Sequence, residues 1–172
     1  MLGIPWSVRP ATADDAVVLT DIVVAAMKEQ QRWPSADAGY EAQWRGKFTL
    51  WTEQCVRNGS LRDHLSVIEV DGQPAGRLRV LRHPSTSSNR GWIELAGIQL
   101  LPAVQNQGIG SAIVRDLQSE ARDARIALRI GVEKDNPRAR ALYERLGCVV
   151  AGETDDEHVL QWDSRPTSPD EP

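Results

Sequence analysis

The sequence predicts a single domain of the mixed α/β (α+β) class. Its 172 residues, 41% apolar and 26% charged, have the size and composition of one globular domain. Apolar residues recur with the helical period in four segments, and short strand-like runs stand between them. Because neither a repeat nor a linker-like stretch interrupts this pattern, we expect one domain over residues 7–162.

The first part of the chain predicts a short strand, two helices and a hairpin. A strand around Ser7–Arg9 precedes Thr12, a good N-cap for a helix with Ala16, Leu19, Val23 and Ala26 on one face. A second helix ends at Asn58-Gly59. The runs 65–70 and 77–82 predict two strands joined by the turn DGQPAG. The stripe of the second helix consists of Trp44, Phe48, Trp51 and Cys55.

Strands and helices alternate in the second part. Residues 92–101 form the most strand-like run, and a glycine-containing turn separates them from a helix with Ile109, Ile113, Leu117 and Ala121 on one face. Residues 126–132 are short, apolar and β-branched, which is typical of a buried strand.

The last elements are a helix and a strand pair. Asn136 and Pro137 suit the N-cap and first turn of that helix, and Gly147 suits its end. The runs 148–153 and 158–162 predict the strand pair. The segment 163–172 has little apolar content, so we expect it to be disordered.

Composition argues against several classes of function. A formal net charge of −4 disfavours general nucleic-acid binding, and no apolar run approaches the roughly 18 residues of a membrane span. The N-terminus does not have the pattern of a secretion signal. Two cysteines, Cys55 and Cys148, provide neither a disulfide framework nor a metal cluster. We therefore expect a cytoplasmic protein with no metal.

The turn QNQGIG at residues 105–110 allows three interpretations. The two glycines could simply permit a tight turn and close packing of helix on strand. A dinucleotide-binding fingerprint would need a small residue at Ile113, and a Walker loop would need Gly-Lys-Ser/Thr. The third interpretation is an anion cradle, in which successive N–H groups at a helix N-terminus converge on a pyrophosphate.

The same segment resembles the Gln/Arg-x-x-Gly-x-Gly/Ala signature of the GNAT superfamily of N-acetyltransferases, which bind acetyl-CoA. IQLLP at 98–102 resembles the family's fourth strand, and EKDNPRARALYERLGC at 133–148 resembles its later Asn-x-x-Ala-x-x-x-Tyr-x-x-x-Gly segment. VVAGE and HVLQW resemble the closing hairpin. The resemblance implies an N-acetyltransferase domain over 7–162, with a mixed, mostly antiparallel sheet of about seven strands flanked by about four helices.

The resemblance also implies a binding site for acetyl-CoA as cosubstrate. The strand backbone at Ile98, Gln99 and Leu100 would pair with the pantetheine arm, and Asn136 would bond that arm or act only as an N-cap. Tyr143 would lie beside the CoA sulfur. The pyrophosphate would lie over Gln105, Asn106, Gln107, Gly108, Ile109, Gly110 and Ser111.

Two residues are candidates for catalysis. Tyr143 matches the family's tyrosine and could protonate the leaving thiolate, although a tyrosine on a helix stripe can equally be a core residue. Glu94 resembles the general base of histone-acetylating members and could take a proton from an amine acceptor. The alternative for Glu94 is a strand glutamate that is exposed or paired with Arg90 or Arg79.

The acceptor is the least defined part of the prediction. Trp33, Tyr40 and Trp44 could line a pocket for it, whereas we favour core positions for Phe48 and Trp51. We expect transfer to a primary amine on a small molecule or peptide, and a possible homodimer. The alternative is a non-catalytic acyl-CoA sensor or interaction module on the same fold.

Overall fold

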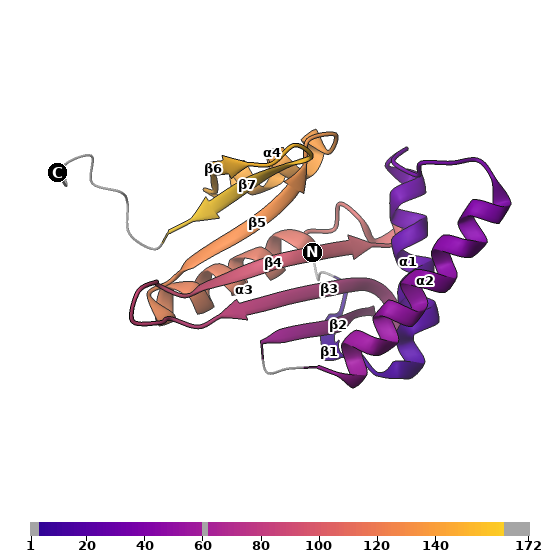
Figure 1. Cartoon of the computed structure of the whole chain (residues 1–172), viewed down its shortest axis with the longest axis horizontal. Helices are drawn as coiled ribbons and strands as arrows, with labels where there is room; N and C mark the ends of the chain where they lie inside the picture. The colour runs from indigo at the N-terminus through magenta and orange to yellow at the C-terminus, as the bar shows by residue number, and fades with distance from the viewer. Residues whose placement is uncertain (1–3, 60–61, 164–172) are drawn as a thin grey trace. The chain divides into compact units, whose positions relative to one another are not determined.

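The computed structural model describes residues 4–59 and 62–163. These residues form four α-helices, two 3-10 turns and a seven-stranded sheet of order β1-β2-β3-β4-β5-β7-β6, in agreement with the predicted fold (Figure 1). The predicted tail, 163–172, lies outside the described residues apart from Asp163. The helices and strands are β1 Trp6–Pro10, α1 Ala16–Glu29, α2 Ala38–Arg57, β2 Asp63–Val70, β3 Gln73–His83, β4 Trp92–Leu100, α3 Ile109–Ala124, β5 Ala127–Glu133, α4 Pro137–Arg145, β6 Val149–Glu153 and β7 Glu157–Trp162.

The chain comprises two compact units, and the strands β3 and β4 contribute to both. The first unit contains residues 1–80 and 97–109, and the second contains residues 81–96 and 110–172.

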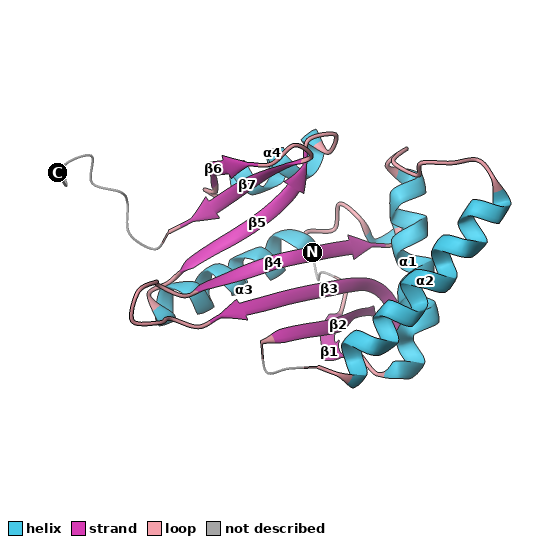
Figure 2. Ribbon diagram, in the orientation of Figure 1, coloured by secondary structure: helices cyan, strands magenta, loops and turns pink. Residues whose placement is uncertain are grey.

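In the first unit, β1 pairs antiparallel with β2, from Trp6 opposite Val70 to Pro10 opposite Ser66. The helices α1 and α2 pack against each other (Figure 2). Burial of apolar side chains stabilises this unit, at about 25 cal/mol per Å² of apolar surface removed from water. Its core cluster consists of Leu19, Ile22, Leu65 and Val67, with Ala11, Val18, Cys55, Val56 and Leu101 against it.

The hairpin of β2 and β3 differs from its prediction. The turn is only Asp71-Gly72, with φ values of 51° and 74°, and β3 already begins at Gln73. Two successive residues with positive φ match the right-handed twist of paired strands, which explains the two-residue loop. The glycine at position 76 serves a close approach within the strand, because a Cβ there would lie 2.9 Å from the backbone oxygen of Gln99.

In the second unit, β4 runs parallel to β5, and β5 pairs antiparallel with β7. The recorded β4–β5 register pairs Trp92–Leu95 with Ala127–Ile130. The helix α4 ends as predicted: Gly147 has a φ of 85°, in the left-handed region that closes many helices. Side chains fully removed from solvent in this unit are Ile93, Leu95, Leu128, Ile130, Val114 and Leu160.

Candidate active site

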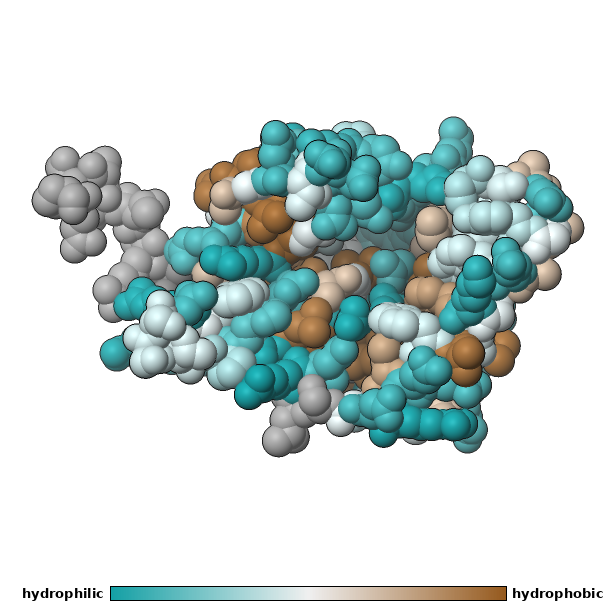
Figure 3. Space-filling model, in the orientation of Figure 1, coloured by the Kyte–Doolittle hydropathy of each residue, from teal (hydrophilic) through white to brown (hydrophobic). Residues whose placement is uncertain are grey.

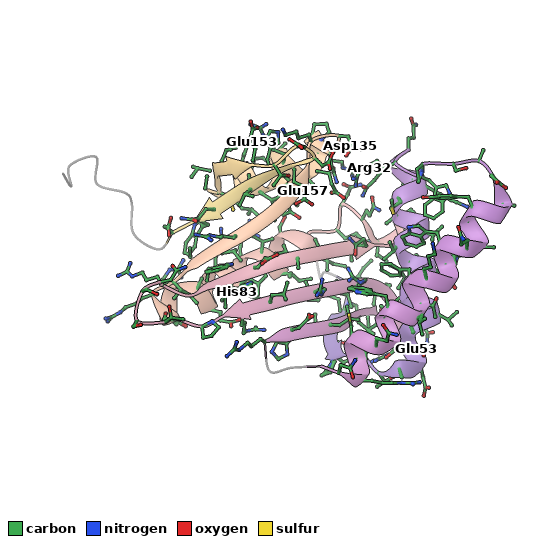
Figure 4. All side chains as sticks on the ribbon, in the orientation of Figure 1. Arg32, Glu53, His83, Asp135, Glu153 and Glu157 are labelled. Atoms are coloured by element: carbon green, nitrogen blue, oxygen red, sulfur yellow. The ribbon has the colours of Figure 1, made fainter. Side chains whose placement is uncertain are left out.

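Glu94 of β4 is held by a histidine. Its Oε2 lies 2.8 Å from Nε2 of His83, and the side chains of Glu94 and His83 are 37% and 34% exposed. Figure 4 labels His83 at the end of β3. Because a carboxylate only accepts, the imidazole is the donor in this hydrogen bond. Arg79, one of the two arginines expected as a partner, instead binds Asp63. The Glu94 carboxylate is therefore oriented and still open to solvent.

The His83 ring is itself held in place. It stacks on Trp92, with ring centroids 4.2 Å apart and planes 13° from parallel. The Arg129 guanidinium lies 4.6 Å from the centroid of Trp92 and donates to Gln161. Sequence reasoning missed His83, because its contact with Glu94 depends on the register across β3 and β4. The available signal in the sequence was that His83 and Glu94 lie near the two ends of one loop, the loop that joins β3 and β4.

Tyr143 lies in the interior of the second unit. Its side chain is on α4 and the residue is 6% exposed. Burial raises the pKa of Tyr143 to about 12, with smaller contributions from Cys148 and Glu133. The phenol consequently keeps its proton at neutral pH. The buried position agrees with both interpretations of this tyrosine, and the retained proton is what a proton donor needs.

Asn136 is the N-cap of α4. Its side-chain oxygen accepts a hydrogen bond of 3.1 Å from the backbone N–H of Ala139. The predicted cap is therefore present. Since the cap uses only the oxygen, the amide N–H groups of Asn136 remain donors that the cap does not engage.

The glycine turn between β4 and α3 is organised by its glutamines. The side-chain amide of Gln105 donates to the Leu100 carbonyl at 2.9 Å, and that of Gln107 donates to the Ala103 carbonyl at 3.0 Å. Asn106 and Gly108 have φ values of 62° and 84°. A Cβ built on Gly108 would meet no atom within 4 Å, so tight packing does not explain this glycine. Its positive φ explains the glycine, as the tight-turn interpretation expects, and the open space beside it agrees with the anion-cradle interpretation.

The aromatic residues of the first unit form a row along α2. Trp33 contacts Trp44 at 5.1 Å between centroids, Trp44 stacks on Phe48 at 4.8 Å, and Phe48 contacts Trp51 at 5.3 Å. Around α2, Figure 3 shows pale residues of intermediate hydropathy beside hydrophilic ones. The prediction that Phe48 and Trp51 are core residues is wrong. Both are only partly buried, and they pack on arginine side chains.

The remaining histidines do not form a metal centre with neighbouring groups. His158 of β7 lies 3.1 Å from Nη1 of Arg140, and its Nδ1 is 3.6 Å from the carboxylate of Glu153. Within residues 4–59 and 62–163, no three histidine, cysteine, aspartate or glutamate side chains gather as metal ligands. No described helix is both long and apolar enough to cross a membrane.

The sequence profile of the acetyltransferase (GNAT) family matches residues 24–148. The chain therefore belongs to this family, and it is an acetyltransferase with acetyl-CoA as its cosubstrate. The chain has no significant match among curated protein sequences.

Solved structures share the fold at low sequence identity. The PaiA N-acetyltransferase of Thermoplasma acidophilum, crystallised with coenzyme A, superposes with a TM-score of 0.71 at 14% identity, covering 93% of this chain and 99% of that one. An acetyltransferase of Thermus thermophilus superposes with a TM-score of 0.70 at 14% identity, covering 95% of this chain and 99% of that one. A GNAT family acetyltransferase of Brucella melitensis, in complex with acetyl-CoA, superposes with a TM-score of 0.58 at 17% identity, covering 96% of this chain and 92% of that one.

Proposed function

We propose that the protein transfers the acetyl group of acetyl-CoA directly to a primary amine. The observation that carries this proposal is the pair of proton-transfer groups in the second unit. Glu94 is an oriented, solvent-accessible carboxylate, and Tyr143 is a buried phenol that keeps its proton. An amine acceptor is protonated near neutral pH, so it needs a base before it can attack, and the departing thiolate needs a proton.

Each step of the transfer has a candidate residue. Glu94, directly or through a water, accepts the proton that the amine loses. A nitrogen–carbon bond to the acetyl group forms, and the carbon–sulfur bond of the thioester breaks. A backbone N–H of β4 donates to the carbonyl oxygen as negative charge develops on it. Tyr143 donates its proton to the sulfur. The nitrogen loses its second proton to water as the amide forms, and water returns a proton to Tyr143.

The cosubstrate would be held mainly by backbone. We assign the pantetheine arm to Ile98, Gln99 and Leu100, which lie beyond the recorded pairing of β4 with β5, and to the amide of Asn136. The pyrophosphate is assigned to the N–H groups of Gln105–Ser111, where α3 begins and its dipole favours an anion. The open space at Gly108 supports this assignment.

Release of thiol from acetyl-CoA, measured with a panel of amines, amino acids, polyamines, aminoglycosides and peptides, tests the amine proposal. Acetylation of at least one amine above background is the expected result. If acetyl-CoA binds and no amine in the panel supports release, transfer to those amines is excluded.

A pair of variants at Gly110 tests the cradle separately. Gly110 lies in the first turn of α3 and is not among the residues with positive φ, so its backbone conformation is one that other residues adopt. Gly110→Val should weaken acetyl-CoA binding by at least about tenfold, because its branched side chain occupies the space of the pyrophosphate. Gly110→Ala, which the family signature allows, is the matched control and should bind nearly as well. Unchanged affinity of a folded Gly110→Val protein, measured by calorimetry, would refute the cradle.

Two further expectations remain proposals. We propose a cytoplasmic location, supported by Cys55 and Cys148 being free thiols in the described structure. We also propose a homodimer, which light scattering of the purified protein would test.

A further inference from the structure

Arg77 of β3 is a buried cation with few partners. The residue is only 5% exposed. Among the residues that the structure describes, its guanidinium makes one hydrogen bond, from Nη1 to the side-chain oxygen of Gln99 at 3.0 Å. Its Nε is buried and has no hydrogen-bond partner within residues 4–59 and 62–163. A guanidinium carries five N–H donors, and a buried charge is costly unless it is paired.

The neighbouring arginine, Arg79, has a carboxylate partner to which Arg77 makes no hydrogen bond in the described structure. Arg79, two residues further along β3, holds Asp63 with two hydrogen bonds, from Nε at 3.0 Å and from Nη2 at 2.7 Å. Asp63 is therefore already engaged as the carboxylate of Arg79. Burial, and to a smaller extent the charge of Arg79, lower the pKa of Arg77 to about 10, whereas Cys55 and Asp63 act in the opposite direction. Even so, Arg77 is charged at neutral pH.

Two aromatic rings lie against the Arg77 guanidinium, but they supply no oxygen acceptor for its N–H groups. Its central carbon lies 5.5 Å from the Phe48 centroid and 5.6 Å from the Trp51 centroid, within the range of cation–π contacts. The N–H groups point outward in the plane of the guanidinium and need acceptors there. A carboxylate fits this edge, because its two oxygens match the fork of N–H groups.

Arg77 lies beside the part of β4 that belongs to the same unit. Its hydrogen-bond partner Gln99 belongs to the segment of β4 that we assign to the pantetheine arm. The same guanidinium lies over the bare backbone of Gly97, where an added Cβ would be 2.9 Å from Nη1. An anion on Arg77 would thus lie next to the strand that carries the thioester.

We propose that Arg77 binds a carboxylate of the acceptor, so that the acceptor is an amino acid or another small amine that carries a carboxylate. This inference rests on the proposed transfer to amines, since it names the class of amine. The half-buried aromatic row from Trp33 to Trp51 would flank the rest of such an acceptor. The buried Nε1 of Trp33, which also has no hydrogen-bond partner in the described structure, is a second donor in this row.

Matched acceptor pairs test the proposal directly. Acetylation of L-leucine and L-phenylalanine would be compared with that of their amides, which keep the amine and side chain and lack the carboxylate. We expect kcat/KM to favour the acids by at least about tenfold, the effect of one hydrogen-bonded charge pair. Equal use of acids and amides would overturn the carboxylate site and leave the amine proposal standing. Failure of every amine would instead overturn the amine proposal.

Variants at Arg77 test whether this residue causes the preference for acids over amides. Arg77→Gln should bring the acid-to-amide ratio to about one without changing acetyl-CoA affinity, whereas Arg77→Lys, which keeps the charge, should retain part of the ratio. Arg79→Lys is the matched control and should leave the ratio unchanged. A preference that survives in Arg77→Gln overturns the assignment. Weaker acetyl-CoA binding in that variant would also overturn it, because Arg77 would then serve the cosubstrate. Should Arg77→Gln not fold, the acid-to-amide ratio would be measured in Arg77→Lys and Gly97→Ala instead. The methyl of Gly97→Ala would displace the guanidinium, so the ratio should fall in both variants.

Discussion

The two candidate proton-transfer groups, Tyr143 on α4 and Glu94 on β4, lie in opposite kinds of environment. The phenol is 6% exposed and its pKa is raised by burial, whereas the carboxylate is 37% exposed and is oriented by His83. Burial keeps a proton on the first group, and a hydrogen bond fixes the direction of the second. This difference suits an acid that meets a sulfur away from water and a base that meets an acceptor arriving from solvent.

A buried thiol in the same unit shows how burial acts on a possible proton acceptor. In water, a phenol with a pKa of about 12 would be a poor donor to a thiolate, because a free thiol titrates near 8.5. Burial raises the pKa of the Cys148 thiol to about 11, however, and Cys148 belongs to the same unit as Tyr143. Burial would raise the pKa of a CoA sulfur in the same direction. The pKa values of donor and acceptor would then rise together.

Removing the phenol hydroxyl should have the largest effect. Tyr143→Phe keeps the ring in the interior, so we expect the fold and the affinity for acetyl-CoA to be retained. Turnover should fall by at least about 100-fold, because the thiolate loses its proton donor. Steady-state thiol release and calorimetry measure the two quantities. Equal turnover in the two proteins would assign Tyr143 to packing alone.

Replacing the Glu94 carboxylate should lower turnover somewhat less than removing the Tyr143 hydroxyl. Glu94→Gln preserves the shape of the side chain and cannot take a proton. We expect turnover to fall about 30-fold at neutral pH, and the loss to shrink as pH rises, because the amine then loses its proton to solvent. A pH series of turnover for both proteins measures this convergence. If the variant keeps both the wild-type rate and the wild-type profile, water or another residue is the base.

Variants of His83 test the orientation of the Glu94 carboxylate separately from its role in proton transfer. His83→Phe keeps an aromatic ring on Trp92 and removes the donor that orients Glu94. Turnover should fall about tenfold with a changed pH profile, and His83→Gln, which restores an N–H donor, should recover most of the loss. Parallel measurements of thermal stability are the control. A loss of stability with an unchanged pH profile would make His83 a structural residue only.

Much of the fold could be predicted from the sequence, because periodic apolar positions mark each helix and strand. The cap at Asn136 and the end at Gly147 are local signals that tertiary contacts did not override. The turn DGQPAG was predicted too long because Gly76 suggested a loop. That glycine instead allows β3 to approach the side chain of Leu100 and the backbone of Gln99.

The side-chain partners could not be predicted in the same way. Strand alternation places Arg77 and Arg79 on one face, but it does not show which of them obtains Asp63. Likewise, the sequence shows that Phe48 and Trp51 share a helix face without showing that they cover a guanidinium. Such pairs depend on register and on packing between distant segments.

The smallest expected effect concerns stability at high pH and tests the burial of Tyr143 without any substrate. Its folded-state pKa of about 12 lies above the usual value of 10.0 for a tyrosine, so between these values the unfolded chain ionises while the folded protein keeps the proton. The unfolded state then binds fewer protons, and the free energy of unfolding falls as pH rises. The contribution is fully present below about pH 10, and about 1 kcal/mol of it should be lost by pH 11. Urea unfolding at pH 9 and pH 11 measures this loss, with Tyr143→Phe as the control in which it should be absent. The same loss in both proteins would show that other groups cause it and that Tyr143 ionises as readily as an exposed phenol.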